Sequence, residues 1–421
     1  MQLTERHIIK ENHSFFEEID NIAFLSKNLY NRANYIIRQE FINTSRQKKS
    51  GKIETAKWIR YNEIQKRLQN DNDYDYRKLP TKVSQQILKL LDKNWTSFFK
   101  AIRGFKKNQT DYMGMPKLPR YKHKTKGRNI LIYTIQSISK KELKNGIVSL
   151  SGTNIKIKTK QNVNDIQQVR IIPKIQHYII EIIYNKEVKN ENLDKSKIAG
   201  IDLGLNNLGA ITSNQNNVKP LLINGRPLKS MNQYFNKKKA KLQSYVGDKS
   251  SNRIHKLTNK RNLKIDNYLH NASKLIVKHL VDNGIGTLVI GKNKFWKTEI
   301  NMSKCNNQAF VNIPHARFIE MISYKCELVG IVVFTTEESY TSKCSFIDVE
   351  EMKHQQKYCG RRRYRGLFVS KNKTKINADC NGSGNIIRKV IPNAFADGIQ
   401  GVVVRPLKVS LKGFNFCKQA A

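Results

Sequence analysis

The sequence predicts a multidomain α/β protein, with a small helical domain and a strand-rich region ahead of a larger mixed sheet. Three observations predict this fold class. Apolar residues recur at three- and four-residue steps in the first hundred residues. Apolar and polar residues alternate between residues 129 and 184, and strands and helices follow one another after residue 198. A chain of 421 residues is long enough for two or more domains.

The composition predicts a polyanionic partner. The chain has 77 Lys and Arg, 33 Asp and Glu and a formal net charge of +44, and such an excess on a folded chain favours nucleic acid. An anionic membrane surface is the alternative, but no apolar run approaches the ~18 residues of a spanning helix. Because the first residues lack the features of a signal peptide, we expect a cytoplasmic protein, nucleoid-associated in a bacterial host. Its six cysteines are then expected to be thiols or metal ligands.

The N-terminal half is predicted to be a sheet or small barrel with an inserted helical domain. Residues 1–10 form a predicted short strand, and helical patterns follow from Phe15 to Ile37 and from about Thr81 to Ile102. Five β-like runs come next, at residues 129–135, 146–150, 154–160, 168–175 and 177–184. Their alternation is typical of an antiparallel sheet or barrel, which the first strand completes if the helices are an insertion.

From Ile198 onward the order of elements predicts a ribonuclease H-like sheet, an antiparallel meander extended by parallel βα crossovers. The elements are, in order, three short strands, a lysine-rich helical stretch over 226–264, an amphipathic helix over 268–284, a buried strand at 287–291, a helix opening at Pro314, a second buried strand at 330–339 and a final helix segment at 384–391.

Two acids are candidate metal ligands at this sheet. Asp202 lies in an apolar run of the first strand, where a lone carboxylate is costly unless a Lys, an Arg or a metal ion compensates it. Asp379 precedes the predicted last helix and can reach the same point, with an ordinary helix N-cap as the alternative role. Nucleases on such a sheet hold two Mg²⁺ ions roughly 3.5–4 Å apart, and Mg²⁺ prefers oxygen ligands.

Several of these segments together resemble the TnpB family. They are "SKNLYNRANYIIRQEF", "GIDLGLNNLGAIT", "IPHARFIEMISYKCELVG", "EESYTSKCS" and "NADCNGSGNI", the last with a DxNxxxNI pattern at Asp379, Asn381, Asn385 and Ile386. TnpB proteins (IS200/IS605-type OrfB) are transposon-encoded, RNA-guided DNA nucleases related to type V CRISPR effectors and to the eukaryotic Fanzor proteins. The resemblance covers most of the chain.

The resemblance implies a domain order. A wedge-like β-barrel is expected at residues 1–12 and 115–190, interrupted by a helical recognition domain at 13–114. A RuvC nuclease domain is expected at 191–421, with a basic zinc-finger-like insertion at about 343–376.

The first departure from the family pattern concerns the usual glutamate, because the strand ends in "LVIGKNKFW" with Gly291 at that place. Neighbouring parallel strands lie ~4.8 Å apart, so a carboxylate from the adjacent segment "TTEESYTS" can arrive over Gly291. The "ExxTS" spacing resembles the rearranged sites of Fanzor and some TnpB relatives, which selects Glu338. Glu337 is expected on the opposite face, since strand side chains alternate. The alternative for both glutamates is a solvated strand end.

The second departure concerns zinc. Two CxxC pairs are usual in the family and are a strong zinc signal, whereas Cys344, Cys359, Cys380 and Cys417 are scattered here. His354 is a further candidate ligand, but lone cysteines are more often small buried residues. We therefore expect no zinc in this insertion.

Three basic runs are candidates for phosphate binding, which needs cations spread over a surface. Residues 101–130 hold nine Lys or Arg, residues 226–264 hold twelve, and residues 352–375 hold nine. The resemblance implies that a guide RNA, encoded near the gene, and a double-stranded DNA target are the partners. The protein would itself recognise a short motif beside the target, a task that suits the helical domain and the barrel.

The leading hypothesis is an RNA-guided, Mg²⁺-dependent DNA endonuclease of a mobile element, in which Asp202, Glu338 and Asp379 hold two Mg²⁺ ions. The first alternative is a nuclease-inactive RNA-guided regulator, favoured by the missing glutamate. The second is a transposase that joins DNA ends itself, which shares the sheet but does not predict the barrel with its helical insertion.

Overall fold

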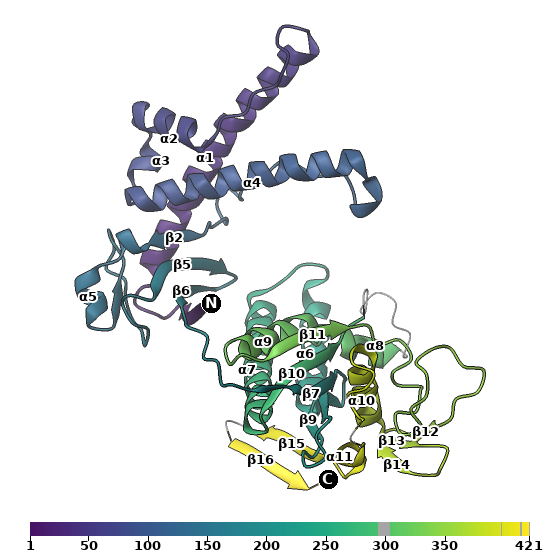
Figure 1. Ribbon diagram of the computed structural model, residues 1–421. Helices are drawn as coiled ribbons and strands as arrows, with labels where there is room; N and C mark the ends of the chain where they lie inside the picture. The colour runs from purple at the N-terminus through teal and green to yellow at the C-terminus, as the bar shows by residue number, and fades with distance from the viewer. Residues whose placement is uncertain (294–303, 397, 413–414, 421) are drawn as a thin grey trace. The chain divides into compact units, whose positions relative to one another are not determined.

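The computed structural model describes residues 1–293, 304–396, 398–412 and 415–420. The chain divides into two compact units, Met1–Lys186 and Glu187–Ala421 (Figure 1). In the described residues, no helix combines the length and the apolar character needed to cross a membrane.

Unit 1 is built on a four-stranded antiparallel sheet in the order β1-β6-β5-β2. The strands are β1 (Gln2–Lys10), β2 (Leu131–Thr134), β5 (Ile166–Lys174) and β6 (His177–Asn185). The first strand of the chain thus pairs along its whole length with the last strand of the unit. A separate hairpin holds β3 (Ile147–Ser149) and β4 (Lys156–Lys158), with η2 (Ile135–Ser137) and α5 (Lys140–Lys144) before it. Within the described residues this sheet has free edges at β1 and β2, so the closed barrel stays a prediction.

The helices of unit 1 follow β1 in the chain and precede β2. They are α1 (Phe16–Lys49), α2 (Tyr61–Asn70), α3 (Tyr74–Arg77), α4 (Thr81–Lys107) and the turn η1 (Gln109–Asp111). Helix α4 begins directly after Pro80, because proline is tolerated at a helix start and not inside it. Trp95 of α4 is fully buried and stacks on Trp58, with ring centroids 6.3 Å apart, at the centre of the apolar contacts between these helices.

Unit 2 contains a seven-stranded sheet in the order β11-β10-β7-β8-β9-β15-β16. Its strands are β7 (Asp194–Asp202), β8 (Asn207–Ser213), β9 (Leu221–Asn224), β10 (Ile285–Gly291), β11 (Val332–Thr336), β15 (Leu407–Lys412) and β16 (Asn415–Ala420). The first three form the antiparallel meander, and β10 and β11 join β7 in parallel, which is the predicted order. The added strands β15 and β16 were not predicted.

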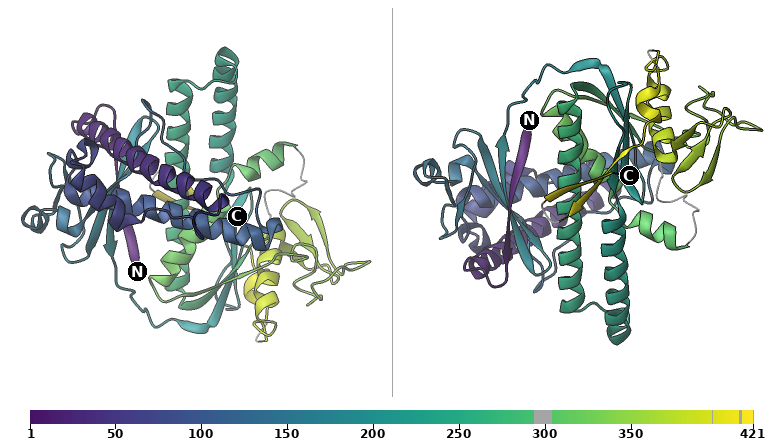
Figure 2. Two further views of the ribbon diagram at one scale, coloured as in Figure 1. Left: turned by 90° about the horizontal axis from the view of Figure 1, so that it is seen from above. Right: turned by 90° about the horizontal axis from the view of Figure 1, so that it is seen from below.

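Helices cover both faces of this sheet (Figures 1 and 2). On one face, α7 (Asn252–Asp282) and α9 (His315–Glu327) pack against Ala199, Ile201 and Ile290. On the other, α10 (Ala378–Val390) packs against Ile198 and Val289. Because side chains alternate along a strand, even-numbered residues of β7, including Asp202, face α10. Helices α6 (Arg226–Val246) and α7 form a long pair (Figure 2).

The smaller elements of unit 2 lie in the connections. They are α8 (Lys304–Val311), α11 (Gln400–Val403) and a three-stranded sheet of β12 (Arg361–Tyr364), β13 (Leu367–Val369) and β14 (Lys375–Asn377). This small sheet falls in the segment predicted as a basic insertion.

The prediction that residues 330–339 form a buried strand is wrong. Strand β11 is only Val332–Thr336, and Phe334 is 45% exposed. The physical reason is position, because among the described strands β11 lies at the edge of the sheet and pairs with β10 alone. Glu338 consequently lies beyond the end of the strand, where the backbone is free to turn.

Candidate active site

Three acidic side chains from separate elements line one open pocket of about 890 Å³ in unit 2. Asp202 ends β7, Glu338 follows β11 by two residues, and Asp379 lies in the first turn of α10. The pKa of Asp202 is raised well above its usual value, first by burial and then by the negative charges of Glu338 and Asp379. The structure therefore brings together the acids singled out from the sequence.

In the described part of the chain, no cationic side chain forms an ion pair with Asp202. Among the described residues none donates a hydrogen bond to its carboxylate or forms an ion pair with it, although the charge of Arg362 lowers its pKa. Helix α10 passes directly over the carboxylate, since a Cβ atom at Gly382 would lie 2.6 Å from Asp202 Oδ2. The sequence left two ways to compensate this buried acid, a Lys or Arg partner or a metal ion. The Lys or Arg partner is not found in the described part of the chain.

Glu338 fills the space above Gly291. In the parallel pairing of β10 with β11, Gly291 lies beside Thr336, two residues before Glu338. A Cβ atom at Gly291 would overlap Glu338 Oε1 and would lie 2.6 Å from Glu338 Cγ. Glu337, in contrast, is exposed and accepts a hydrogen bond from its neighbour Ser339.

One carboxylate oxygen of Glu338 is held and the other is not. Asn293 accepts a hydrogen bond from the Glu338 backbone N–H at 2.7 Å and donates to Oε2 at 3.4 Å. Oε1 is buried without a hydrogen-bond partner. Burial raises the pKa of Glu338 to about 7, against an opposing effect of Lys389. An unpaired buried oxygen is costly, so this carboxylate is poised for a proton or a cation.

Asp379 is part of the last helix and does not cap it. The N-cap is Asn377, whose side chain accepts from the backbone N–H groups of Asp379 and Cys380. The Asp379 carboxylate instead accepts hydrogen bonds from Asn207 at 2.7 Å and from Arg362 at 3.2 Å. The N-cap alternative for Asp379 is thus wrong, as is the placement of Asp379 before the helix, because α10 starts earlier than residue 384.

Polar side chains on α10 connect the three elements that carry these acids. Ser383 donates to the Gly200 carbonyl oxygen on β7. Asn385 donates to the carbonyl oxygens of Thr341 and Cys344 at 2.9 Å each, and Asn381 also donates to Cys344. The Thr341 N–H and hydroxyl in turn both donate to the Glu338 carbonyl oxygen. The asparagines of the DxNxxxNI pattern therefore tie the segment after Glu338 to the helix that carries Asp379.

Arg362 is a site residue that the sequence did not single out. It lies on β12, forms an ion pair with Asp379 and lines the pocket together with Arg226, Arg365, Arg405 and Lys408. Its only sequence signal was membership of the basic run 352–375. No local pattern distinguishes it from Arg361 or Arg363, so the tertiary fold alone places it beside the acids.

The predicted insertion is held by a buried carboxylate. Glu350 is 7% exposed, and its carboxylate accepts from the backbone N–H groups of Ser345 at 2.7 Å and Cys359 at 2.9 Å. Cys344 donates to the Glu351 carbonyl oxygen, and Cys359 is exposed. The side chains of Cys305 and Cys417 lie outside the described residues.

In the described ranges, no three side chains of His, Cys, Asp or Glu stand close enough to hold one metal ion. The three carboxylates of the pocket are likewise not close enough together to hold one ion in this structure, in which Asp379 forms an ion pair with Arg362. The donor chemistry nevertheless fits Mg²⁺, since all three side chains offer hard oxygen atoms. The unpaired Oε1 of Glu338 and the Asp202 carboxylate, which no cationic side chain pairs with in the described residues, also suit a bound cation.

Comparison with known proteins gives two family models and one curated relative. Residues 181–297 match the OrfB_IS605 model, described as probable transposase, and residues 315–386 match the Cas12f1-like TNB domain. The TnpB-like protein ORF457 of Acidianus two-tailed virus is 24% identical over 445 aligned positions, which cover 94% of this chain and 86% of that protein.

The solved structures that resemble this chain include two RNA-guided effectors. A chain of a Cas12f1–sgRNA–target DNA complex has a TM-score of 0.36 and 16% identity, covering 91% of this chain and 98% of that one. The mini-RNA-guided endonuclease CRISPR-Cas_phi3 has a TM-score of 0.44 and 10% identity, covering 92% of each chain.

The sheet order and the acidic pocket define the class, an α/β protein with a ribonuclease H-like sheet whose carboxylates meet between the central strands and the last helix. Within that class, the matches to the two family models and to the viral TnpB-like protein show that the chain is similar to the TnpB family.

Proposed function

We propose that this chain is an RNA-guided, Mg²⁺-dependent DNA endonuclease of a mobile element. The observation that carries the proposal is the meeting of Asp202, Glu338 and Asp379 in one pocket, with Glu338 in the place of a side chain at Gly291. The similarity to the TnpB family supports RNA guidance, and the net charge of +44 supports a nucleic-acid partner.

Asp202, Glu338 and Asp379 are the residues that would hold two Mg²⁺ ions. When bound, such ions supply an activated water and stabilise the leaving oxygen of a phosphodiester. Asn293 orients the Glu338 carboxylate, and Asn207 orients the Asp379 carboxylate, through the hydrogen bonds described above.

The basic lining of the pocket suits a nucleic-acid strand. Arg362 is paired with Asp379, and its guanidinium is released to a phosphate group if Asp379 turns toward a cation. Arg226, Arg365 and Lys408 add positive charge around the same opening. The acids would therefore meet a phosphodiester that basic side chains have already bound.

The experiment is to purify the protein with its co-expressed RNA, sequence that RNA and assay cleavage of matched double-stranded DNA with Mg²⁺. Asp202→Asn and Asp379→Asn should abolish cleavage and keep guided DNA binding. Cleavage that needs no RNA would favour a transposase that joins DNA ends itself.

The nuclease-inactive regulator remains the second candidate, favoured by Gly291 in place of the usual glutamate. It predicts that the parent complex binds matched DNA and never cuts it with Mg²⁺ present. The Glu338 carboxylate above Gly291 favours the nuclease, because a site without metals has no use for a second buried acid.

A further inference from the structure

We infer that Arg362 blocks the metal site of unit 2 in the free protein, because its guanidinium binds Asp379 in place of a metal ion. Nη2 of Arg362 lies 3.2 Å from Asp379 Oδ1, and the second oxygen, Oδ2, accepts a hydrogen bond from Asn207 at 2.7 Å. Both oxygens of this carboxylate are therefore engaged by the chain itself. The inference concerns the regulation of the proposed active site, and it rests on the proposed function for the presence of a metal ion.

The charge of Arg362 also acts on a second acid of the pocket. Burial and the charges of Glu338 and Asp379 raise the pKa of Asp202, and Arg362 is the cation that opposes them. One guanidinium thus partly offsets the charge of two carboxylates, which a bound metal ion would otherwise do. Arg365 lines the same pocket, but in the described part of the chain it forms no ion pair.

The small sheet of the insertion, which lies beside α10 (Figure 1), fixes the backbones of both partners. Arg362 on β12 pairs with Phe368 on β13, and Phe368 pairs with Ile376 on β14. Phe368 and Ile376 are buried in one apolar cluster with Ala378, the residue before Asp379. Because these backbones are packed together, the ion pair opens by rotation of the two side chains. The Arg362 side chain is 45% exposed and has room to rotate.

The ion pair and a divalent cation compete for Asp379. A metal ion on Oδ1 would lie close to the guanidinium that contacts the same oxygen. Repulsion between two such cations is strong in a partly buried site, where water screens it poorly. Metal binding therefore requires Arg362 to leave, and any ligand that removes Arg362 strengthens metal binding by the same factor.

The consequence is a site that takes up metal poorly until its substrate is present. In the free chain, the three carboxylates are not close enough together to hold one ion. An anion that takes up the guanidinium frees the Asp379 carboxylate, so the anion and the metal ion bind with positive cooperativity. An ordinary surface ion pair, which contributes little to stability, is the alternative role for these two residues, and it predicts no such coupling.

The test measures Mn²⁺ binding by the full chain, stripped of nucleic acid and metal, with isothermal titration calorimetry. Mn²⁺ is the probe because it prefers the same oxygen ligands as Mg²⁺. The variant of the ion pair is Arg362→Gln. The matched control is Arg361→Gln, which removes the same charge from the preceding residue of β12, outside the pocket lining. Arg365→Gln measures the effect of losing a charge that lines the pocket, and Asp202→Asn shows whether the Mn²⁺ is bound there.

We expect Arg362→Gln to bind Mn²⁺ at least about fivefold more tightly than the parent, because it removes a competing ion pair and a repelling charge. Arg361→Gln should stay within about twofold of the parent, since exposed charges are screened. Arg365→Gln should gain less than Arg362→Gln, because no ion pair is lost with it. Asp202→Asn should lose the Mn²⁺ binding.

Reciprocal linkage gives a second measurement, on the parent protein itself. Phenylglyoxal modifies accessible guanidinium groups, and peptide mapping by mass spectrometry follows each arginine separately. Mn²⁺ should speed the modification of Arg362 and leave that of Arg361 unchanged, because metal binding releases Arg362 from Asp379. In Asp379→Asn, which lacks the ion pair, Arg362 should react at the faster rate with or without Mn²⁺.

Equal Mn²⁺ affinities of the parent and Arg362→Gln, with binding still lost in Asp202→Asn, would overturn the inference and leave the proposed metal site intact. A gain in Arg361→Gln or Arg365→Gln as large as that in Arg362→Gln would also overturn it, since the effect would then come from the general positive charge. Mn²⁺ binding that Asp202→Asn does not change, or no binding by any of these proteins, would contradict the metal site and the inference together. Neither measurement involves RNA, DNA or cleavage, so a failure of RNA guidance would show in the cleavage assay alone.

Discussion

The Glu338 carboxyl group occupies the space that any side chain at Gly291 would need. Gly291 ends β10 and pairs with Thr336, the last residue of the neighbouring parallel strand β11, and Glu338 follows Thr336 by two residues. Either position can therefore deliver an acid to the pocket, but both cannot do so at once. This exclusion accounts for the absence of a glutamate on β10 in a site that still contains three acids.

Glu338→Gln should lower cleavage of guided DNA by about 100-fold or more, because a metal ligand contributes several kcal/mol to the transition state. Guided DNA binding should be unchanged, since the substitution keeps the shape of the side chain. The matched control is Glu337→Gln, at the exposed neighbouring position, which should cut within about twofold of the parent. Full cleavage by Glu338→Gln would refute the role assigned to Glu338.

Placing the glutamate at residue 291 and a small residue at 338 should move the acid from the segment after β11 to the end of β10. Gly291→Ala alone should destabilise the protein by about 1–3 kcal/mol through overpacking, because its Cβ atom meets Glu338 and Ile386. Glu338→Ala should relieve most of that cost, which a double-mutant cycle of thermal unfolding will measure. Gly291→Glu with Glu338→Ala is the variant in which recovered cleavage is informative, whereas Glu338→Gln keeps the obstructing atoms. Strictly additive stability effects would show that the two side chains do not compete.

The stability of the metal-free protein should depend on pH through Glu338. Its pKa is raised from 4.5 to about 7 in the folded state, so the native state binds the extra proton between these values. Stability contributed by this group is thus present below pH 4.5 and is lost as pH rises through about 7, by about 3 kcal/mol in total. Without metal, the stability of Glu338→Gln relative to the parent should increase as pH rises from 5 to 8. Mg²⁺ at ~100 times its dissociation constant should stabilise the parent by about 2.7 kcal/mol and the variant by less. A pH-independent difference would contradict this account.

Asn385→Ala should destabilise the protein by about 1–3 kcal/mol, because it leaves the Thr341 carbonyl oxygen without its donor and removes one of the two hydrogen bonds to the Cys344 carbonyl oxygen. The cleavage rate should fall by more than the loss of folded protein explains, since the segment after Glu338 loses its attachment to α10. Asn271→Ala is the control, because Asn271 is half-buried and, among the described residues, its side chain donates to Asn267 alone. Cleavage rates measured well below the unfolding temperature separate the two effects. Unchanged cleavage in folded Asn385→Ala would remove the positioning role.

The insertion at 343–376 should stay folded without zinc. Dialysed protein should contain well under one zinc per chain, and a zinc chelator should not lower its unfolding temperature. Glu350→Gln should destabilise the protein by about 1–3 kcal/mol, since a buried carboxylate accepting two backbone N–H groups is lost. Glu351→Gln, at a largely exposed position, should be neutral. Stoichiometric zinc that depends on Cys344 and Cys359 would refute this prediction.

The sequence by itself determined the order of elements from Ile198 and the two acids Asp202 and Asp379. These follow from local patterns, because apolar periodicity defines strands and helices and a lone acid in an apolar strand is conspicuous. The sequence also directed attention to Glu338 through the resemblance and through the alternation of side chains. It missed the exposure of β11, since an apolar run looks the same at the edge and in the middle of a sheet. It missed β15 and β16 as well, because short strands after the last helix carry little periodicity.

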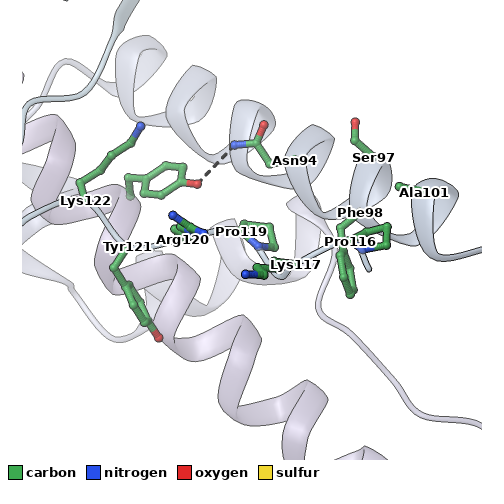
Figure 3. Close-up of a pocket in the computed structure, with 11 residues that line it drawn as sticks. Asn94, Ser97, Phe98, Ala101, Pro116, Lys117, Pro119, Arg120, Tyr121 and Lys122 are labelled. Atoms are coloured by element: carbon green, nitrogen blue, oxygen red, sulfur yellow. Dashed lines mark hydrogen bonds between the residues drawn. The ribbon is translucent and has the colours of Figure 1, made fainter. Parts of the chain in front are cut away.

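Only the tertiary structure decided which charges meet. Arg362 and Asn207 reach Asp379 from elements far apart in the chain, and Glu350 clamps two loops that no motif connects. Such contacts depend on how elements pack, and the energy of a buried charge depends on its surroundings and not on its neighbours in sequence. The same reason applies to the segment 116–122 (Figure 3), whose lysines look like an ordinary basic run in the sequence, whereas in the structure Asn31 and Asn34 hold its backbone against α1.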